Sequence, residues 1–489
     1  MLAQLSKFVY EPRLRALFDT WSPWAIVTLA AFLRFFGLGY PQTLVFDETY
    51  YVKDAFSLSQ SGFEHDWPAG SDDGFAAGQV PAFADTGSFV VHPPLGKWII
   101  SIGMWLFGPG NAFGWRFSVA LLGTAAVFLV ILVARKLFKS TVWAALAGFF
   151  FAIDGVSIVM ARTALLDSIL MFFVLLAFWF MLLDRERSFG QLFNRPWLLA
   201  AGIALGCASA VKWSGAYFLA FFGIYVVASE LLANRDTSFV QFAKSAASKF
   251  VILVPTAVVT YVATWTGWLT TTGGYDRNWS EDIANRWTGL LSWVPTPLQS
   301  LWHYHVDAYN FHVGLRTPHS YASSPLSWFF LSRPTSFFYV GLAEGEESCV
   351  SPSGCSSAIT ALGNPFIWWA SIAAIVFLIV VAIRQRDKTA NLILLGIAAG
   401  YLPWMLYLQR TVFQFYVIAF EPFVVLALVY ALAVIWRRTA PERRSRLMAA
   451  YATYAFATLA FSLFYLPIWF GTWTPYWFWF LHMPIPSWI

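Results

Sequence analysis

Residues 34–51 read Arg-Phe-Phe-Gly-Leu-Gly-Tyr-Pro-Gln-Thr-Leu-Val-Phe-Asp-Glu-Thr-Tyr-Tyr, and this stretch carries the most specific signal in the chain. It begins near the end of an apolar run over 22–38 and contains two adjacent acids, Asp47 and Glu48. An apolar run of this kind is a candidate membrane span. Ionisable groups close to membrane depth are costly, so they are functional candidates by default. The stretch therefore predicts a membrane protein with a functional acid pair just outside its first span.

The composition of the whole chain is that of an integral membrane protein. Of its 489 residues, 58% are hydrophobic and only 12% are charged, and the mean hydropathy is +0.60. About a quarter of the residues in soluble domains are charged. The 26 tryptophans fit a protein with many lipid–water boundaries, where Trp and Tyr are enriched. The net charge of +5 does not indicate a nucleic-acid partner, because cytoplasmic loops of membrane proteins collect Lys and Arg.

Eleven runs of about 20 apolar residues predict transmembrane helices. They lie near 22–38, 113–134, 141–159, 163–183, 196–211, 213–231, 250–269, 365–383, 389–408, 412–435 and 447–470. A twelfth apolar run, about 94–108, is short and carries Lys97 near its start. Its tryptophans and isoleucines suit a helix that lies at the outer interface without crossing.

The distribution of Lys and Arg sets the topology. If 94–108 does not cross, six segments that hold 20 of the 31 Lys and Arg residues share the cytoplasmic side. This is the arrangement that the positive-inside rule favours. The six segments are 1–21, 135–140, 184–195, 233–249, 384–388 and 436–446. The prediction is an N-terminus inside, a C-terminus outside, and two large outer segments over 39–112 and 270–364.

Two of the three cysteines lie in the second outer segment. Cys349 and Cys355 enclose five residues that include Pro and Gly, which makes a loop that can close. An oxidising outer compartment would allow a disulfide between them. The alternative is a pair of free thiols. Cys207 lies in a span and is interpreted as a packing residue.

Cations recur at the predicted outer ends of the spans. The four are Arg116, Arg162, Lys212 and Arg410, with the acid Asp167 following Arg162. Arg and Lys bind phosphate groups, and Arg does so through two parallel hydrogen bonds. A nearby carboxylate could take a proton from a hydroxyl group. Together these residues predict a site for a lipid-phosphate head group, with all four cations around one outward cavity.

Each of these residues has a simpler interpretation. An Arg at the end of a span often extends to the lipid head groups. Arg162 and Asp167 could form an ion pair that locks two helices. Asp47 and Glu48 could be solvated, or could belong to a site for a divalent cation.

Four histidines follow in the second outer segment, at 303, 305, 312 and 319. The spacing of His303 and His305 does not match a helical zinc pair. Contacts with a peptide or a lipid are the preferred interpretation of this stretch.

The motifs resemble those of the protein O-mannosyltransferase family, in the family's order and over nearly the whole chain. They are Arg34 with Phe-Asp47-Glu48, His92-Pro-Pro-Leu-Gly-Lys97, Arg162 with Leu165-Leu166-Asp167-Ser168, Gly206-Cys207 with Val211-Lys212-Trp213, Pro318-His319-Ser-Tyr321 through Trp328, and the final four-span unit. The resemblance implies the C-type glycosyltransferase fold, an all-α polytopic membrane architecture. It also implies transfer of mannose from a polyprenyl phosphate to Ser or Thr of proteins outside the cytoplasm, with inversion at the anomeric carbon.

The resemblance also implies roles for individual residues. Asp47 matches the catalytic base, and Glu48 and Arg116 match other essential positions. Arg162, Lys212 and Arg410 match positions that would bind the donor phosphate. The matching positions expected to support the site are Arg34, His92, Lys97 and Asp167.

The implied module boundaries follow the topology. Residues 1–21 are a cytoplasmic N-terminus, 22–269 a transmembrane catalytic module, 270–364 an extracytoplasmic loop, and 365–489 a four-span module with an outer C-terminus. Eukaryotic members carry a β-trefoil domain in the second outer segment, for which the 95 residues over 270–364 leave no room. The chain is similar to the bacterial, actinobacterial-type branch of the family.

The expected location is the plasma membrane, with an extracytoplasmic site. The expected partners are polyprenyl-phosphate-mannose, Ser/Thr-containing acceptor proteins and the lipid bilayer. The acceptor proteins could be modified during Sec export. No nucleic acid is expected. No cofactor is expected to be required. Whether the site binds a metal is unknown, and a divalent cation (Mg or Mn) is one option. Two alternatives are a related transferase that acts on a lipid or cell-wall glycan, and a transporter. The transporter is disfavoured because the charges gather at one membrane face and not near the midplane.

Overall fold

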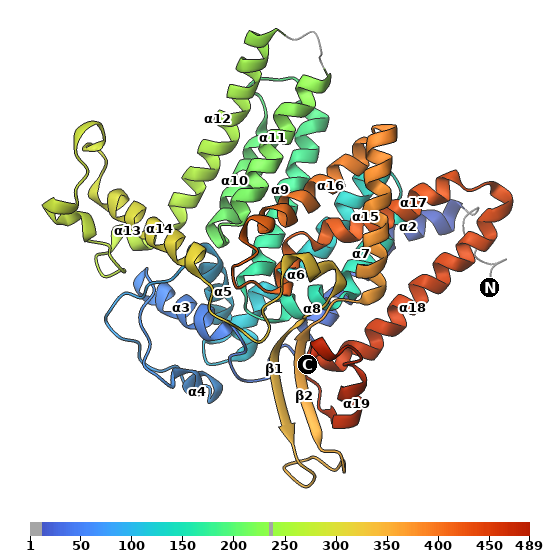
Figure 1. Cartoon of the computed structure of the whole chain (residues 1–489), viewed down its shortest axis with the longest axis horizontal. Helices are drawn as coiled ribbons and strands as arrows, with labels where there is room; N and C mark the ends of the chain where they lie inside the picture. The colour runs from blue at the N-terminus through green and yellow to red at the C-terminus, as the bar shows by residue number, and fades with distance from the viewer. Residues whose placement is uncertain (1–11, 234–237) are drawn as a thin grey trace.

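The computed structural model describes residues 12–233 and 238–489, and helices make up most of it (Figure 1). Lys7 and Arg235, which belong to two of the predicted basic segments, lie outside the described residues. The helices of the first half are α2 (Pro12–Phe35), α3 (Glu48–Ser61), α4 (Ser71–Ala76), α5 (Leu95–Phe107), α6 (Ala112–Phe138), α7 (Thr141–Ile153), α8 (Gly155–Arg162), α9 (Leu166–Arg187), α10 (Pro196–Val211), α11 (Gly215–Ala233) and α12 (Phe239–Thr264). The helices of the second half are α13 (Thr266–Thr270), α14 (Thr296–Gly314), α15 (Pro365–Gln385), α16 (Lys388–Tyr401), α17 (Glu421–Arg438), α18 (Arg444–Phe470) and α19 (Tyr476–Leu481).

Every predicted span coincides with at least one helix. Within residues 12–233 and 238–489, eight helices are long and apolar enough to cross a membrane, and α7 with α8, bent by 58° at Asp154, would make a ninth. The two other predicted spans correspond to α10, with 16 residues, and α17, with 18. The count of eleven therefore stays a prediction.

The predicted start of one span, at 412, is wrong. Residues Gln414–Ala419 form a 3-10 turn, and the α-helix begins at Glu421. The physical reason is Pro422, since proline fits the first turn of a helix and breaks its interior.

The short helix α5 covers the run 94–108. Its 13 residues extend over about 20 Å, which is less than the ~30 Å thickness of the hydrocarbon core. It buries Lys97 and Ile100, whereas Trp105 is 83% exposed. Its length and its single exposed face agree with the prediction that this helix does not cross.

A small antiparallel sheet adds to the predicted helical fold. It has the order β1 (Thr335–Leu342), β2 (Cys355–Ala361) and β3 (Thr474–Pro475). In the hairpin, Thr335 pairs with Ala361 and Leu342 with Cys355. The sheet thereby joins the second outer segment to the chain after α18 (Figure 1). Cys349 and Cys355 form a disulfide across the hairpin connection, as the sequence predicts.

Three packed helices, α6, α9 and α10, carry predicted site residues at or next to one of their ends. Helices α9 and α10 pack against each other, and α9 also packs on α6. Arg116 lies in the first turns of α6, Asp167 in the first turn of α9, and Lys212 directly after α10. The opposite ends of the same helices carry basic clusters: Arg135 and Lys136, Arg185 and Arg187, and Arg195. One end of this helix layer therefore holds the candidate site and the other holds the basic residues.

Candidate active site

Glu48 is completely buried and fixed by four N–H donors. Its carboxylate accepts from Nε and Nη2 of Arg116, both at 2.8 Å, and from the backbone N–H groups of Val45 (3.0 Å) and Ala164 (2.8 Å). Arg116 donates its remaining hydrogen bonds to the carbonyl groups of Leu38, Pro41 and Thr43. This bidentate pair joins the loop before α3, helix α6 and the turn before α9.

Asp47 lies at the N-cap position of α3 and, unlike Glu48, is only partly buried. Its carboxylate interacts electrostatically with Lys212 and Asp167 and accepts a hydrogen bond from the Tyr51 hydroxyl. Burial raises the pKa of Asp47 to about 6, against the lowering effect of Lys212. A carboxylate with a pKa near neutrality is suited to accept a proton.

The residue before Asp47 fixes its direction. Phe46 has a φ of +49°, which is a rare conformation for an aromatic residue. Its ring stacks on Phe337 at 5.0 Å and meets Phe413 and Phe415 edge to face. This packing holds the chain in the unusual turn that separates the directions of Asp47 and Glu48.

Lys212 lies in the tight turn between α10 and α11. Its ammonium group is 3.0 Å from both carboxylate oxygens of Asp167 and 4.6 Å from the centre of the Tyr416 ring. The turn depends on Gly215, since a Cβ there would lie 2.4 Å from the backbone of Ala208. The glycine thus lets α11 start close to the end of α10 and keeps Lys212 beside Asp167.

Arg410 is held by His312 of α14. Its Nε donates to the carbonyl oxygen of His312 (2.9 Å) and its Nη2 donates to Nδ1 of the same residue (3.1 Å). The other ring nitrogen, Nε2, donates to the carbonyl oxygen of Val91 at 2.8 Å. Burial lowers the pKa of His312 to about 4, so the ring is neutral and accepts from Arg410. Three of the five N–H groups of Arg410 make no hydrogen bond with another described residue and are available to a ligand.

Lys212 and Arg410 line one cavity of about 480 Å³. Polar side chains of His92, Ser209 and His312 lie on it together with the aromatic residues Trp213, Tyr217, Tyr261, Tyr309, Trp404, Tyr407 and Tyr416. Helices α11 and α12 contribute small apolar residues, including Ala216 and Val258. Val258 is 53% exposed, so the cavity reaches the outer surface of the helix layer. A charged part and an apolar part thus share one space.

Two family models together match most of the chain. The first, described as dolichyl-phosphate-mannose-protein mannosyltransferase, matches residues 24–271. The second, described as the C-terminal four TMM region of protein-O-mannosyltransferase, matches residues 297–488. The chain belongs to the protein O-mannosyltransferase family. This membership confirms the resemblance and makes the protein a glycosyltransferase.

Relatives of known name and solved structures are similar to this chain over most of its length. A polyprenol-phosphate-mannose–protein mannosyltransferase of Mycolicibacterium smegmatis is 32% identical over 96% of this chain and 93% of its own. The Corynebacterium glutamicum protein of the same name is 29% identical over 96% and 94%. The donor-bound Pmt1-Pmt2 complex of S. cerevisiae has a TM-score of 0.71 at 17% identity, covering 93% of this chain and 90% of that one. ArnT from Cupriavidus metallidurans bound to undecaprenyl phosphate has a TM-score of 0.50 at 18% identity, covering 88% and 63%. These structures confirm the C-type glycosyltransferase fold.

Two of the four cations predicted to surround the cavity, Arg116 and Arg162, do not line it. Arg116 is occupied by Glu48 and three carbonyl groups, as above. Arg162 donates to the carbonyl oxygens of Leu33, Arg34, Phe36 and Gly37 at the end of α2 and lies over the Phe470 ring. The prediction that four cations surround one cavity is therefore wrong for these two. The alternative of an Arg162–Asp167 ion pair is not formed, because Asp167 pairs with Lys212 and Arg162 satisfies backbone carbonyl groups that the end of α2 leaves without a helical partner.

The predicted supporting residues have structural contacts. Arg34 is buried and donates to Ser157 Oγ at 2.7 Å and to the carbonyl oxygens of Ala30 and Ala152, which ties α2 to the bend between α7 and α8. Lys97 pairs with Glu64 and donates to the carbonyl oxygen of His92 at 3.0 Å. Lys97 thereby fixes the backbone that carries His92 to the cavity.

His312 contacts Arg410 and was not among the predicted site residues. The signal was present, because His305 and His312 are seven residues apart and lie on one face of a helix. That face also carries Leu301, Tyr304 and Ala308, which are buried.

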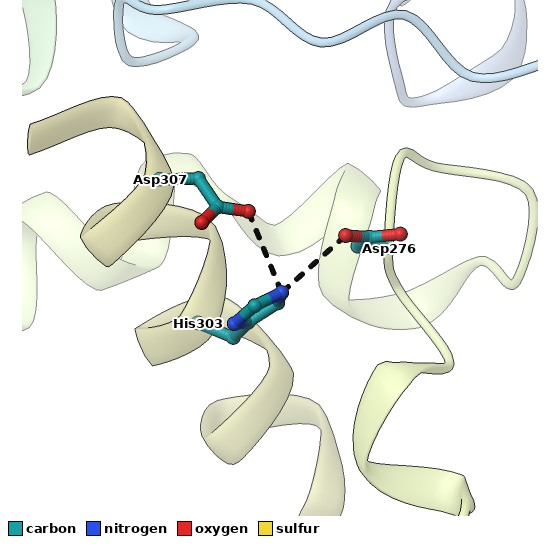
Figure 2. Close-up of side chains that lie close together, drawn as sticks. All are labelled: Asp276, His303 and Asp307. Carbon is teal, nitrogen blue, oxygen red and sulfur yellow. Dashed lines mark ion pairs between the residues drawn. The ribbon is translucent and has the colours of Figure 1, made fainter. Parts of the chain in front are cut away.

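The two acids, Asp47 and Glu48, have different partners. The oxygens of Glu48 are occupied by its four donors, while Asp47 interacts with Lys212 and Tyr51. A divalent cation at this acid pair stays a prediction. Within the described residues, one group of side chains could hold a metal ion: Asp276, His303 and Asp307 (Figure 2).

Proposed function

We propose that the protein transfers mannose from polyprenyl-phosphate-mannose to Ser or Thr hydroxyl groups of proteins at the extracytoplasmic face, with inversion. One observation carries this proposal: a carboxylate with a raised pKa, Asp47, interacts with Lys212, which shares a cavity with Arg410. A base and two phosphate-binding cations are the groups that glycosyl transfer from a lipid phosphate requires.

The reaction is a displacement at the anomeric carbon. The acceptor oxygen forms a bond to C1 of mannose as the bond between C1 and the phosphate oxygen breaks. The hydroxyl proton goes to Asp47, and the electron pair of the broken bond goes to the polyprenyl phosphate. Attack from the face opposite the leaving phosphate inverts C1.

The donor phosphate is assigned to Arg410 and Lys212. Arg410 offers three N–H groups in a planar fork, and His312 fixes the direction of that fork. Lys212 adds a point charge, part of which Asp167 already balances. The apolar residues of α11 and α12 on the same cavity suit the first isoprene units of the lipid. These groups would stabilise the negative charge that develops on the leaving phosphate.

Glu48 and Arg116 act as positioning residues in this proposal. Every oxygen of Glu48 is occupied, and it contacts Arg116 and backbone groups only. The pair fixes the turn in front of α3 and so the place of Asp47. Arg162 has a similar supporting role, because it binds the backbone at the end of α2, where this loop begins.

A transfer assay tests the function. The purified protein, mixed with polyprenyl-phosphate-[¹⁴C]mannose and a Ser/Thr-rich peptide, is expected to give a peptide that carries mannose on a hydroxyl group, with the anomeric configuration opposite to that of the donor. Mass spectrometry of the glycopeptide identifies the residue, and an Asp47→Asn variant is the control. If label passes instead to an added lipid or cell-wall glycan and never to the peptide, the protein-acceptor proposal is contradicted.

The site is proposed to face outward in the plasma membrane because the basic clusters lie at the opposite ends of the same helices. A single cysteine at Ser140→Cys, in a Cys207→Ser background that keeps the disulfide, is expected to react with an impermeant maleimide only after the membrane is opened. Ser292→Cys, in the second outer segment, is expected to react from outside in intact cells. Labelling at 140 in intact cells would contradict the eleven-span topology. Modification during Sec export stays a prediction.

A further inference from the structure

A second cluster of chemically active side chains lies on the outer face of α14, away from the cavity. Asp276 is in the loop between α13 and α14, and His303 and Asp307 lie four residues apart on α14 (Figure 2). The three potential ligand atoms lie within 4.8 Å of one another. Figure 2 shows both carboxylates directed at the same ring nitrogen, Nε2 of His303.

The distances fit a shared metal ion better than hydrogen bonds. Nε2 of His303 is 3.5 Å from Asp276 Oδ2 and 3.4 Å from Asp307 Oδ2. Charge-assisted N–H···O bonds are shorter, about 2.7–2.9 Å. Two ligands bound to a tetrahedral zinc ion at about 2.0–2.2 Å each lie about 3.3–3.6 Å apart. The two separations from Nε2 are those of neighbouring ligands in such a site, and the two carboxylate oxygens lie within 4.8 Å of each other.

The charge of the cluster also calls for a cation. Within the described residues, neither carboxylate has an ion pair with Lys or Arg; His303 is the partner of both. The adjacent Arg277 turns away and donates to the carbonyl oxygens of Trp268 and Leu269. Two carboxylates close together disfavour each other's ionisation, and a bound cation removes this repulsion.

The histidine ring is held in place for this role. Trp279 stacks on it with ring centres 3.9 Å apart and planes 9° apart. The spacing of His303 and Asp307 places two ligands on successive turns of one helix face, as in helical metal motifs. A ring fixed by stacking and two ligands on one helix form a preorganised set.

We propose that Asp276, His303 and Asp307 bind one divalent metal ion of the zinc class, with water as the fourth ligand. One nitrogen and two carboxylate oxygens are a ligand set that zinc accepts. His303 and His312 are nine residues apart, which at 100° per residue places them on opposite faces of α14. The ion therefore lies across the helix from the cavity and fastens the loop that contains Asp276 to the helix that holds Arg410 through His312.

Metal content of the full-length protein in detergent tests this site independently of mannose transfer. The wild type is first treated with a chelator and then dialysed against Zn²⁺. It is expected to retain about one zinc ion per chain, as measured by inductively coupled plasma mass spectrometry. Asp276→Asn, His303→Gln and Asp307→Asn should each weaken Zn²⁺ binding by more than the roughly 10–100-fold that loss of an outer-shell partner produces. Glu281→Gln, an exposed acid of the same loop, is the matched control and should bind Zn²⁺ as the wild type does.

Two further measurements guard against unfolded variants. Zn²⁺ is expected to raise the thermal midpoint of the wild type and of Glu281→Gln, but not that of the three ligand variants, whose midpoints without metal should match the wild type. Co²⁺ bound in place of Zn²⁺ should show the visible absorption bands of a tetrahedral site. The proposal is overturned if the wild type retains no Zn²⁺, or if the triple variant binds Zn²⁺ as tightly as the wild type. Either result would leave the mannosyltransferase proposal intact.

Discussion

Asp47→Asn is expected to lower the rate of mannose transfer by about 10²–10⁴ at saturating donor and acceptor, because that is the usual contribution of a general base. Asparagine keeps the shape of the side chain and can still accept a hydrogen bond from Tyr51, so donor binding should change little. The rate is measured as labelled glycopeptide formed per enzyme in a single turnover. Near-normal turnover of Asp47→Asn would show that Asp47 is not the base.

The pH profile gives a second test of the same residue. Burial raises the pKa of Asp47 to about 6, and only the ionised carboxylate accepts a proton. The value of kcat/KM in the wild type should therefore rise with pH up to about pH 6 and level off above it, with a loss of about tenfold per pH unit below. This acid limb should be absent from the residual activity of Asp47→Asn.

Arg410→Gln is the contrasting variant. It keeps a hydrogen-bonding side chain but removes the charge that faces the donor phosphate. Loss of a hydrogen bond to a charged group costs about 1.5–3 kcal/mol, so donor affinity should fall by about 10–150-fold. Lys212→Ala should also weaken donor binding, but it leaves Asp167 without its partner and so combines two effects. If Arg410→Gln binds the donor as tightly as the wild type, Arg410 is not a ligand of the donor phosphate.

Glu48→Gln is expected to have the second large effect, on stability. Glu48 and Arg116 are both essentially inaccessible to solvent, with 0% and 1% of the side chain exposed. Removing one charge of a buried pair leaves the other uncompensated, which costs about 3–5 kcal/mol. The amide also replaces an acceptor oxygen with an N–H₂ group that faces N–H donors. The thermal midpoint in detergent should fall by several degrees, and activity should be lost at temperatures where the wild type is still folded.

The control for this variant is Glu186→Gln at the opposite, basic end of the helices. Its carboxylate pairs with Lys136 but is more than half exposed, and exposed ion pairs contribute little to stability. Glu186→Gln should keep the midpoint of the wild type. If Glu48→Gln does so as well while losing activity, Glu48 acts in the reaction directly and the assignment as a positioning residue is wrong.

The helical membrane fold and the positions of the candidate site residues follow from the sequence. Each apolar run is a local property, because hydrocarbon of a given thickness requires about 20 apolar residues in succession. The acids that follow the first span, Lys212 in a short turn, and the closable loop between Cys349 and Cys355 are also visible locally. For this reason each predicted apolar run coincides with a helix, and the disulfide lies where it was predicted.

Which charged groups meet depends on the tertiary structure. Glu48 and not Asp47 pairs with Arg116, 68 positions away; Asp167 pairs with Lys212; and His312 holds Arg410 across 98 positions. Arg162, which the sequence places among the phosphate ligands, is occupied by the carbonyl groups at the end of α2. Periodicity along the chain fixes which residues lie on a helix face, but not which face of another helix lies opposite. That choice depends on how the helices pack, because a charge buried at their contact is stable only beside a partner that satisfies it.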